Sequence, residues 1–142
     1  MPSLTGKIAL ITGASSGIGF GIAGHFAALG AAVIVHARHQ DDAQAAAARL
    51  EAAGHDCTTA AADLRDADAC RRMMHAAIAW KGGLDVLVNN AGMTDRGSLE
   101  DATIEPPPRV FIDLTASCRQ MNGARRLTAM ISSHSSTGAS SR

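Results

Sequence analysis

The sequence predicts an α/β protein built on a doubly wound parallel sheet. Short apolar runs alternate along the chain with longer segments in which apolar residues recur at helical spacing. Glycines stand where several of these segments end, and a glycine-rich turn joins the first apolar run to the first helical segment. Strands that alternate with helices in this way form crossover units, which are right-handed in nearly all proteins.

The first crossover unit is expected between residues 7 and 37. Residues 7–12 (KIALIT) and 31–37 (AAVIVHA) are apolar runs of the kind that form buried parallel strands. The helix between them should stop near Gly30, where a left-handed cap costs little. Its apolar residues fall at helical spacing: Ile18, Ile22, Phe26 and Leu29.

The second crossover follows directly. Asp41 or Asp42 is placed to cap an alanine-rich helix that closes at Gly54. Residues 57–62 then form a third expected strand.

A third crossover leads to the fourth strand. Asp66 is placed to cap a helix that runs through Trp80 and stops before Gly82. Residues 84–88 (LDVLV) form the fourth expected strand, which ends at Asn89.

The pattern changes after Glu105. Residues 106–108 are three prolines, which remove backbone hydrogen bonds and clash with preceding carbonyl groups inside a helix. Any helix must therefore begin after them. Residues 131–142 are serine-rich, which is typical of a short strand and loop or of a frayed tail. We therefore divide the chain into residues 1–105 and a divergent tail, residues 106–142.

The composition describes a soluble globular chain. Apolar residues make up 46% and charged residues 18% of the 142 residues, and 13 basic side chains balance 13 acidic ones. This length suits one folding unit, and no basic patch indicates binding to DNA or RNA. The first apolar run is broken by Gly13 and is too short for a signal peptide or a membrane span. We therefore expect a cytoplasmic protein that does not enter a membrane.

The cysteines and histidines indicate neither a disulfide framework nor a metal site. Cys57, Cys70 and Cys118 are odd in number and widely spaced, so reduced and mostly buried thiols are expected. His36 and His39 form the only close histidine pair in the sequence, and no third ligand follows at a plausible spacing.

Residues 12–19 read TGASSGIG, and the three glycines meet a specific physical demand. A tight turn needs a residue without Cβ, a phosphate approaches the backbone only where side chains are absent, and the helix must lie close to the strand. Free amides and the helix dipole then favour negative charge at the helix start. Glycines also simply form turns, but a strand–turn–helix–strand context favours the pyrophosphate of a dinucleotide.

The end of the second expected strand indicates which dinucleotide binds. An acidic residue there would bond the ribose hydroxyls of NAD, whereas arginine accommodates the 2′-phosphate of NADP. Ala37 and Arg38 stand in that place, and a guanidinium fork matches phosphate oxygens. Ser15 offers a further hydroxyl donor. NADP is therefore favoured over NAD, and the alternative is that Arg38 is an ordinary solvated charge.

Three motifs resemble the short-chain dehydrogenase/reductase family, over residues 7 to about 100. They are TGASSGIG at 12–19, Ala-Asp-Leu at 62–64 and Asn-Asn-Ala-Gly at 89–92. The resemblance implies a Rossmann-like sheet, with residues 1–105 as the dinucleotide-binding half. It implies cofactor contacts from Gly13, Ser15, Ser16, Gly17, Ile18 and Gly19, from Asp63 and Leu64 near the adenine, and from Asn89, Asn90, Ala91 and Gly92 beside the adenosine ribose.

Two of these places have a structural alternative. Asp63 would serve equally as the cap of the helix that follows it. The side-chain amides of Asn89 and Asn90 would serve to hold neighbouring strand ends together, a role that is compatible with touching a cofactor.

The resemblance also implies hydride transfer to or from a small carbonyl or alcohol substrate, in which the protein supplies the proton. The family uses a Tyr, a Lys, a Ser and an Asn for this step. This chain contains no tyrosine, and its only lysines are Lys7 and Lys81. Ser133 is the candidate for the catalytic Ser, with an ordinary hydroxyl in a polar tail as its alternative. Asp113 stands where the family carries the Asn.

These departures predict a sheet truncated after about the fourth or fifth strand. We expect an NADP(H)-dependent oxidoreductase by family that has little hydride-transfer activity, because it lacks the Tyr and Lys. An exposed sheet edge would lower solubility or be covered by an oligomer or another partner. The alternatives are a non-catalytic dinucleotide-binding module and an unstable fragment.

Overall fold

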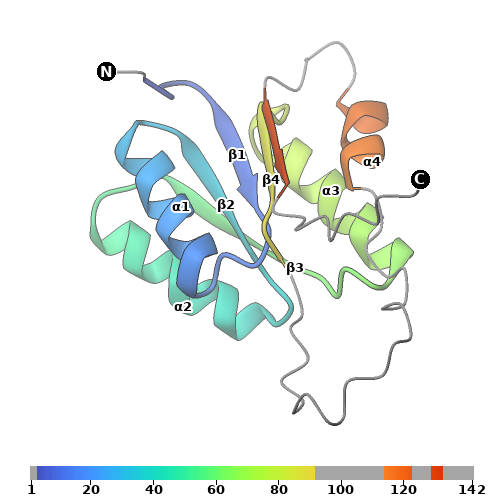
Figure 1. The fold of residues 1–142 in the computed structure, drawn as a ribbon, viewed down its shortest axis with the longest axis horizontal. Helices are drawn as coiled ribbons and strands as arrows, with labels where there is room; N and C mark the ends of the chain where they lie inside the picture. The colour runs from blue at the N-terminus through green and yellow to red at the C-terminus, as the bar shows by residue number, and fades with distance from the viewer. Residues whose placement is uncertain (1–2, 92–113, 123–128, 133–142) are drawn as a thin grey trace, which may run out of the picture.

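The computed structural model describes residues 3–91, 114–122 and 129–132. They form a parallel sheet of strand order β3-β2-β1-β4-β5 with helices on both faces (Figure 1), which confirms the predicted doubly wound architecture. The elements are β1 (Ile8–Ile11), α1 (Gly17–Ala28), β2 (Ala32–Ala37), α2 (Gln40–Ala52), β3 (Cys57–Ala61), α3 (Ala67–Lys81), β4 (Val86–Asn89), α4 (Leu114–Met121) and β5 (Ala129–Ser132).

The helices bury both faces of the sheet. Figure 1 shows α1 and α2 against one face and α3 and α4 against the other. Alternate residues of β1 enter the two cores: Ile8 and Leu10 pack with α3, whereas Ala9 and Ile11 pack with α1. Because both faces are buried, the strands read in sequence as continuous apolar runs.

The strand order reverses at β1, and this reversal positions the candidate site. The chain runs outward through β2 to β3 and then returns to β4 on the other side of β1. Ligands of open α/β sheets bind outside the carboxyl ends of the strands at such a reversal. There the N–H of Thr12, just after β1, donates to the carbonyl of Val88 in β4 (3.0 Å).

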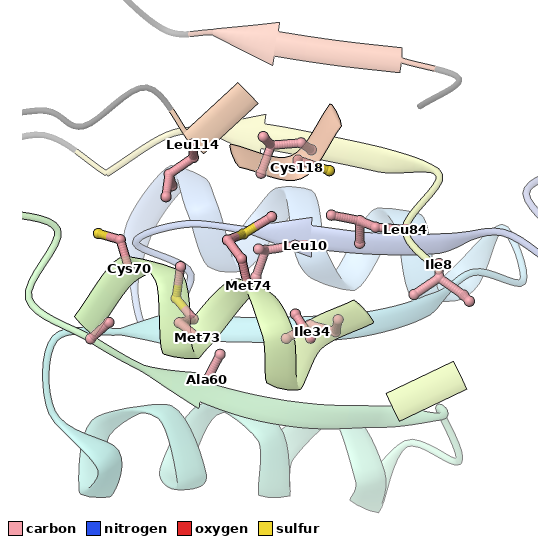
Figure 2. Packing of buried hydrophobic residues seen from close by; sticks show 13 residues of the cluster. Ile8, Leu10, Ile34, Ala60, Cys70, Met73, Met74, Leu84, Leu114 and Cys118 are labelled. Carbon is pink, nitrogen blue, oxygen red and sulfur yellow. The ribbon is translucent and has the colours of Figure 1, made fainter. Parts of the chain in front are cut away.

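The core on the α3 face consists largely of sulfur-containing and branched side chains. Figure 2 shows Cys70, Met73 and Met74 of α3 beside Leu10 and Ile34 of the sheet. The flexible thioether of methionine fills irregular gaps between a helix and a twisted sheet. These contacts fix α3 across β1 and β2.

The ends of α3 lie close to where the sequence predicts them. The carboxylate of Asp66 accepts hydrogen bonds from the N–H groups of Asp68 (2.9 Å) and Ala69 (3.2 Å), as an N-cap does. At the other end Gly82 adopts the left-handed conformation with φ of 79°.

Two boundaries differ from the prediction. α2 begins at Gln40 without a side-chain cap, so Asp41 and Asp42 lie in its first turn, where carboxylates interact favourably with the helix dipole. β4 begins at Val86 rather than at residue 84. Its predicted first residue, Leu84, instead bonds the side chain of Asn122.

Asn122 fixes α4 to the start of β4. Its Oδ1 accepts from the N–H of Leu84 (2.9 Å), and its Nδ2 donates to the carbonyl of Leu84 (2.8 Å). The Asn122 side chain is buried, so these bonds satisfy polar groups that are removed from water. α4 begins at Leu114, after the prolines as predicted, and β5 extends the sheet beyond β4 with Ala129 opposite Val86.

Several sequence predictions lie outside the described residues. These concern Gly92, the prolines 106–108, Asp113 and Ser133. Within the three described ranges, no helix combines the length and the apolarity that crossing a bilayer requires.

Replacing Asn122 tests whether α4 is fixed to the sheet as described. Asn122→Ala leaves the buried N–H and carbonyl of Leu84 without these partners, and we expect it to lower the free energy of unfolding by about 1–3 kcal/mol in urea titrations. Gln120→Ala changes an exposed residue of the same helix and should have an effect within about 0.5 kcal/mol. Equal effects of the two variants would contradict this placement of α4.

Candidate functional site

A cavity of about 370 Å³ lies at the carboxyl ends of the strands, beside the reversal of strand order. It brings together eight of the residues predicted from the sequence: Gly13, Ser15, Ser16, Arg38, Asp63, Leu64, Asn90 and Ala91. It is also lined by four residues for which the sequence predicted no cofactor contact: His36, Ala37, Ala62 and Arg65.

A larger cavity, about 550 Å³, lies between β3 and α3. Its walls are mostly alanine and threonine, and none of the predicted site residues lines it. Its size alone does not make it the functional site, because it lacks a convergent set of polar groups. We therefore build the site around the smaller cavity.

The N-terminus of α1 is arranged differently from those of the other two long helices. Ser16 is its N-cap residue, but the Ser16 side chain makes no capping hydrogen bond, and the first turn contains no acidic residue. By contrast, α3 is capped by Asp66 and α2 has two acidic residues in its first turn. The first amides of a helix have no acceptor within the helix. The start of α1 therefore presents N–H groups and a positive dipole end without a carboxylate of its own.

The glycines of this turn are required by close approach. A Cβ on Gly19 would collide with the carbonyl oxygen of Gly13 and the amide of Asn90. A Cβ on Gly13 would lie 2.9 Å from Cα of Ala91, and Gly13 has φ of 63°. At Gly17, with φ of 59°, a Cβ would meet no atom within 4 Å, so here the backbone conformation alone favours glycine.

The N–H and the carbonyl of Gly13 are each hydrogen-bonded to a buried or half-buried side chain. Its N–H donates to Nδ1 of His36 (3.0 Å), and its carbonyl accepts from Nδ2 of Asn90 (3.3 Å). The N–H of Ala14 donates to the carbonyl of His36 (2.8 Å). The amides of Gly13 and Ala14 are therefore used internally, so Gly13 contributes to the cavity by its conformation.

Asn90 performs the structural role that the sequence left open for it. Its Nδ2 also donates to the carbonyl of Thr12 (3.1 Å), while Oγ1 of Thr12 accepts from the N–H groups of Asn90 (3.0 Å) and Ala91 (2.9 Å). These bonds join the turn after β1 to the residues after β4. Asn89 ends β4 opposite Ser132 of β5.

Asp63 does not cap α3, because Asp66 does. Its carboxylate accepts from the guanidinium of Arg65 through Nε (3.0 Å) and through the second terminal nitrogen (2.8 Å), and from the N–H of Arg65 (3.0 Å). These hydrogen bonds hold the pKa of Asp63 far below its usual range. Arg38 approaches the same carboxylate more loosely, at 3.7 Å, and its side chain is 56% exposed.

His36 is the main site residue whose role sequence reasoning missed. It is 2% exposed, and its Nε2 lies 3.0 Å from the carbonyl of Ala62 while Nδ1 accepts from Gly13. The signal was a polar residue one position before the end of an otherwise apolar buried strand. In the described part of the chain, no group of three His, Cys, Asp or Glu residues is arranged to hold a metal ion.

The contact of Gly19 with Gly13 gives a test with a control in the same helix. Gly19→Ala places a methyl group against backbone, and we expect loss of folded protein or destabilisation by more than about 3 kcal/mol in urea titrations. Gly21→Ala meets no atom within 4 Å and should stabilise the protein by about 0.5–1 kcal/mol, since alanine favours the helix. A Gly19→Ala protein as stable as the wild type would contradict the described contact.

Comparisons with known proteins show the family and the fold. Residues 7–132 match the family model for short chain dehydrogenases. The chain is similar to oxidoreductase UcpA of Salmonella typhimurium, with 44% identity over 105 residues, covering 74% of this chain and 40% of UcpA.

Solved structures show the same similarity. A short chain dehydrogenase from Burkholderia cenocepacia in complex with NADP superposes with a TM-score of 0.64 at 43% identity, covering 72% of this chain and 42% of that one. A 7α-hydroxysteroid dehydrogenase complexed with NADH gives a TM-score of 0.62 at 36% identity, covering 64% and 36%. The chain spans about two fifths of the length of the curated relatives that it matches. On the match over residues 7–132 and this shared fold, the chain belongs to the short chain dehydrogenase family.

Proposed function

We propose that this chain binds NADP(H) at the cavity beside the start of α1, as the coenzyme-binding part of a carbonyl or alcohol oxidoreductase. The observation that carries the proposal is the pairing of an uncapped helix N-terminus with a glycine turn that closely approaches its neighbours. A pyrophosphate needs both free N–H groups and a backbone that it can approach.

The first turn of α1 and its cap residue would hold the pyrophosphate. Gly17, Ile18 and Gly19 offer backbone amides at the start of α1. They do not line the cavity themselves, but Ser15 and Ser16 directly before them do. Ile18 is 78% exposed, the one exposed large apolar residue in the described part of the chain. Contact with the bound coenzyme would remove this surface from water.

The loop after β3 and the residues after β4 would hold the adenosine. Asp63 and Leu64 line the cavity on one side, and Asn90 and Ala91 line it on the other. We assign the adenine to the first pair. The adenosine ribose is assigned to residues 89–92, of which Gly92 lies outside the described residues.

Arg38 and Arg65 support NADP over NAD. Two guanidinium groups share the single carboxylate of Asp63, so the charged side chains that line the cavity carry a net positive charge. A 2′-phosphate would complete this arrangement through charge-assisted hydrogen bonds. The relatives do not decide the coenzyme, because one solved neighbour is an NADP complex and another an NADH complex.

Residues 1–142 by themselves are expected to bind the coenzyme but to catalyse hydride transfer only slowly. The nicotinamide supplies or accepts the hydride, while a protein group must handle the proton. The 142 residues contain no tyrosine, and Ser133, our candidate for orienting a carbonyl, lies outside the described residues. The substrate class is therefore proposed from the family alone.

Location and assembly remain part of this proposal. The free thiols of Cys57, Cys70 and Cys118 suit a reducing compartment such as the cytoplasm. β5 lies at the edge of the described sheet, and a second copy or another partner that pairs with it would cover its open backbone groups.

Reversing the charge of Arg38 tests the coenzyme preference. Arg38→Asp removes about 1.5–3 kcal/mol of charge-assisted bonding to a 2′-phosphate, so the Kd for NADPH should rise about 10- to 100-fold in fluorescence titrations. The Kd for NADH should change much less. Arg71→Asp, an exposed charge on α3, is the matched control and should leave both values unchanged. Equal weakening of NADPH and NADH by Arg38→Asp would remove Arg38 from the phosphate site.

Activity is tested separately from binding. We expect residues 1–142 to bind NADPH but to oxidise it with a panel of ketones far more slowly than the roughly 1–1000 s⁻¹ of ordinary enzymes. The decrease in NADPH absorbance with time is the measurement. Turnover in the ordinary range would show that another group of this chain handles the proton.

A further inference from the structure

We propose that His36 is a positioning residue for the coenzyme site, whose neutral ring holds the glycine turn and the loop after β3 at a fixed separation. The inference rests on the proposed function, because it concerns the same cavity. It assigns a role to a buried histidine that acts in its uncharged form. Three observations carry it.

The first observation is the hydrogen-bonding direction at the ring. A backbone N–H only donates, so Nδ1 of His36 accepts from Gly13 (3.0 Å) and carries no proton. The proton of the neutral ring is then on Nε2, which donates to the carbonyl of Ala62 (3.0 Å). The two partners therefore fix both the tautomer and the orientation of the ring.

The second observation is what these partners adjoin. Gly13 begins the turn that leads to the amides of α1, and Ala62 directly precedes Asp63, which holds Arg65. β1 and β3 are not neighbours in the sheet, because β2 lies between them. The ring thus joins the proposed pyrophosphate side of the cavity to the proposed adenosine side.

The third observation is that the surroundings favour the neutral ring. His36 is 2% exposed, and burial lowers its pKa, although the hydrogen bond to Ala62 opposes this shift. The charged side chains lining the cavity are Arg38, Asp63 and Arg65. Among the elements packed around β2, β1 has no ionisable side chain and β3 has Cys57 at its far end. The titratable side chains of α1 and α2 are all exposed: His25, Asp41, Asp42, Arg49 and Glu51. On the other face of the sheet, α3 contributes Cys70 to the core.

The pH dependence has a definite sign. Because the folded-state pKa of His36 is lowered, the unfolded chain takes up the proton first as the pH falls through about 6.5. The stability that the neutral ring provides is complete above that pH and is lost on further acidification. Protonation in the folded state would set an N–H against the N–H of Gly13 and release the turn.

Two substitutions separate positioning from simple packing. His36→Leu removes both hydrogen bonds, and we expect the Kd for NADPH at pH 8 to rise at least about tenfold. His36→Asn keeps an acceptor for Gly13 but has no donor at the position of Nε2, so its Kd should lie between the wild-type and His36→Leu values. His75→Leu, an exposed histidine of α3, is the control and should have no effect. A folded His36→Leu protein that binds NADPH as tightly as the wild type would overturn the proposal.

A measurement on the unmodified chain keeps the test decisive if His36→Leu does not fold. Nitrogen NMR of the apo protein should show the His36 ring still neutral, with its proton on Nε2, at a pH below the usual pKa of histidine. The NADPH affinity of the wild type should fall more steeply on acidification than that of His36→Asn, since protonation of the phosphate affects both alike. A proton on Nδ1 at neutral pH, or identical pH profiles, would overturn the positioning role. A wild-type chain that binds neither NADPH nor NADH would instead overturn the proposed function itself, and this inference with it.

Discussion

The candidate site depends on how the backbone of Gly13 is held in place. Its N–H is bound by a ring from β2 and its carbonyl by an amide that follows β4, and a Cβ at this position would lie 2.9 Å from Cα of Ala91. Three strands thus determine where the turn leaves the sheet. Only residues without side chains fit between these neighbours. α1 begins at Gly17, four residues after Gly13, and Ser15 and Ser16 between them line the cavity.

The distribution of charge around the cavity is the second feature of the candidate site. α1 carries no acidic residue at its start, whereas the starts of α2 and α3 do. On the opposite wall, the single carboxylate of Asp63 is already occupied by Arg65, and Arg38 stands nearby with a half-exposed guanidinium. Both walls therefore favour an anion with more than one negative group. The proposed coenzyme NADP(H), with a pyrophosphate and a third phosphate, would satisfy both.

The sequence predicted those parts of the molecule that are determined locally. Strand runs, the glycine turn and the Asp66 cap depend on residues close together in the chain, and the structure has each of them near its predicted place. The roles of His36 and Asn122 depend on partners 23 and 38 residues away, so no local pattern could identify those partners. Asp63 was ambiguous for a local reason: two aspartates three residues apart could each have capped α3, and the structure has Asp66 as the cap.

The central claim is that the amides at the start of α1 receive the pyrophosphate of a bound dinucleotide. The most direct test is a titration of the labelled chain with NADPH, followed by proton–nitrogen correlation NMR. We expect saturable shifts for the amides of Gly17, Ile18 and Gly19, with the amide of Gly54, just after α2, unchanged. Saturable binding that leaves those three amides unmoved would contradict it.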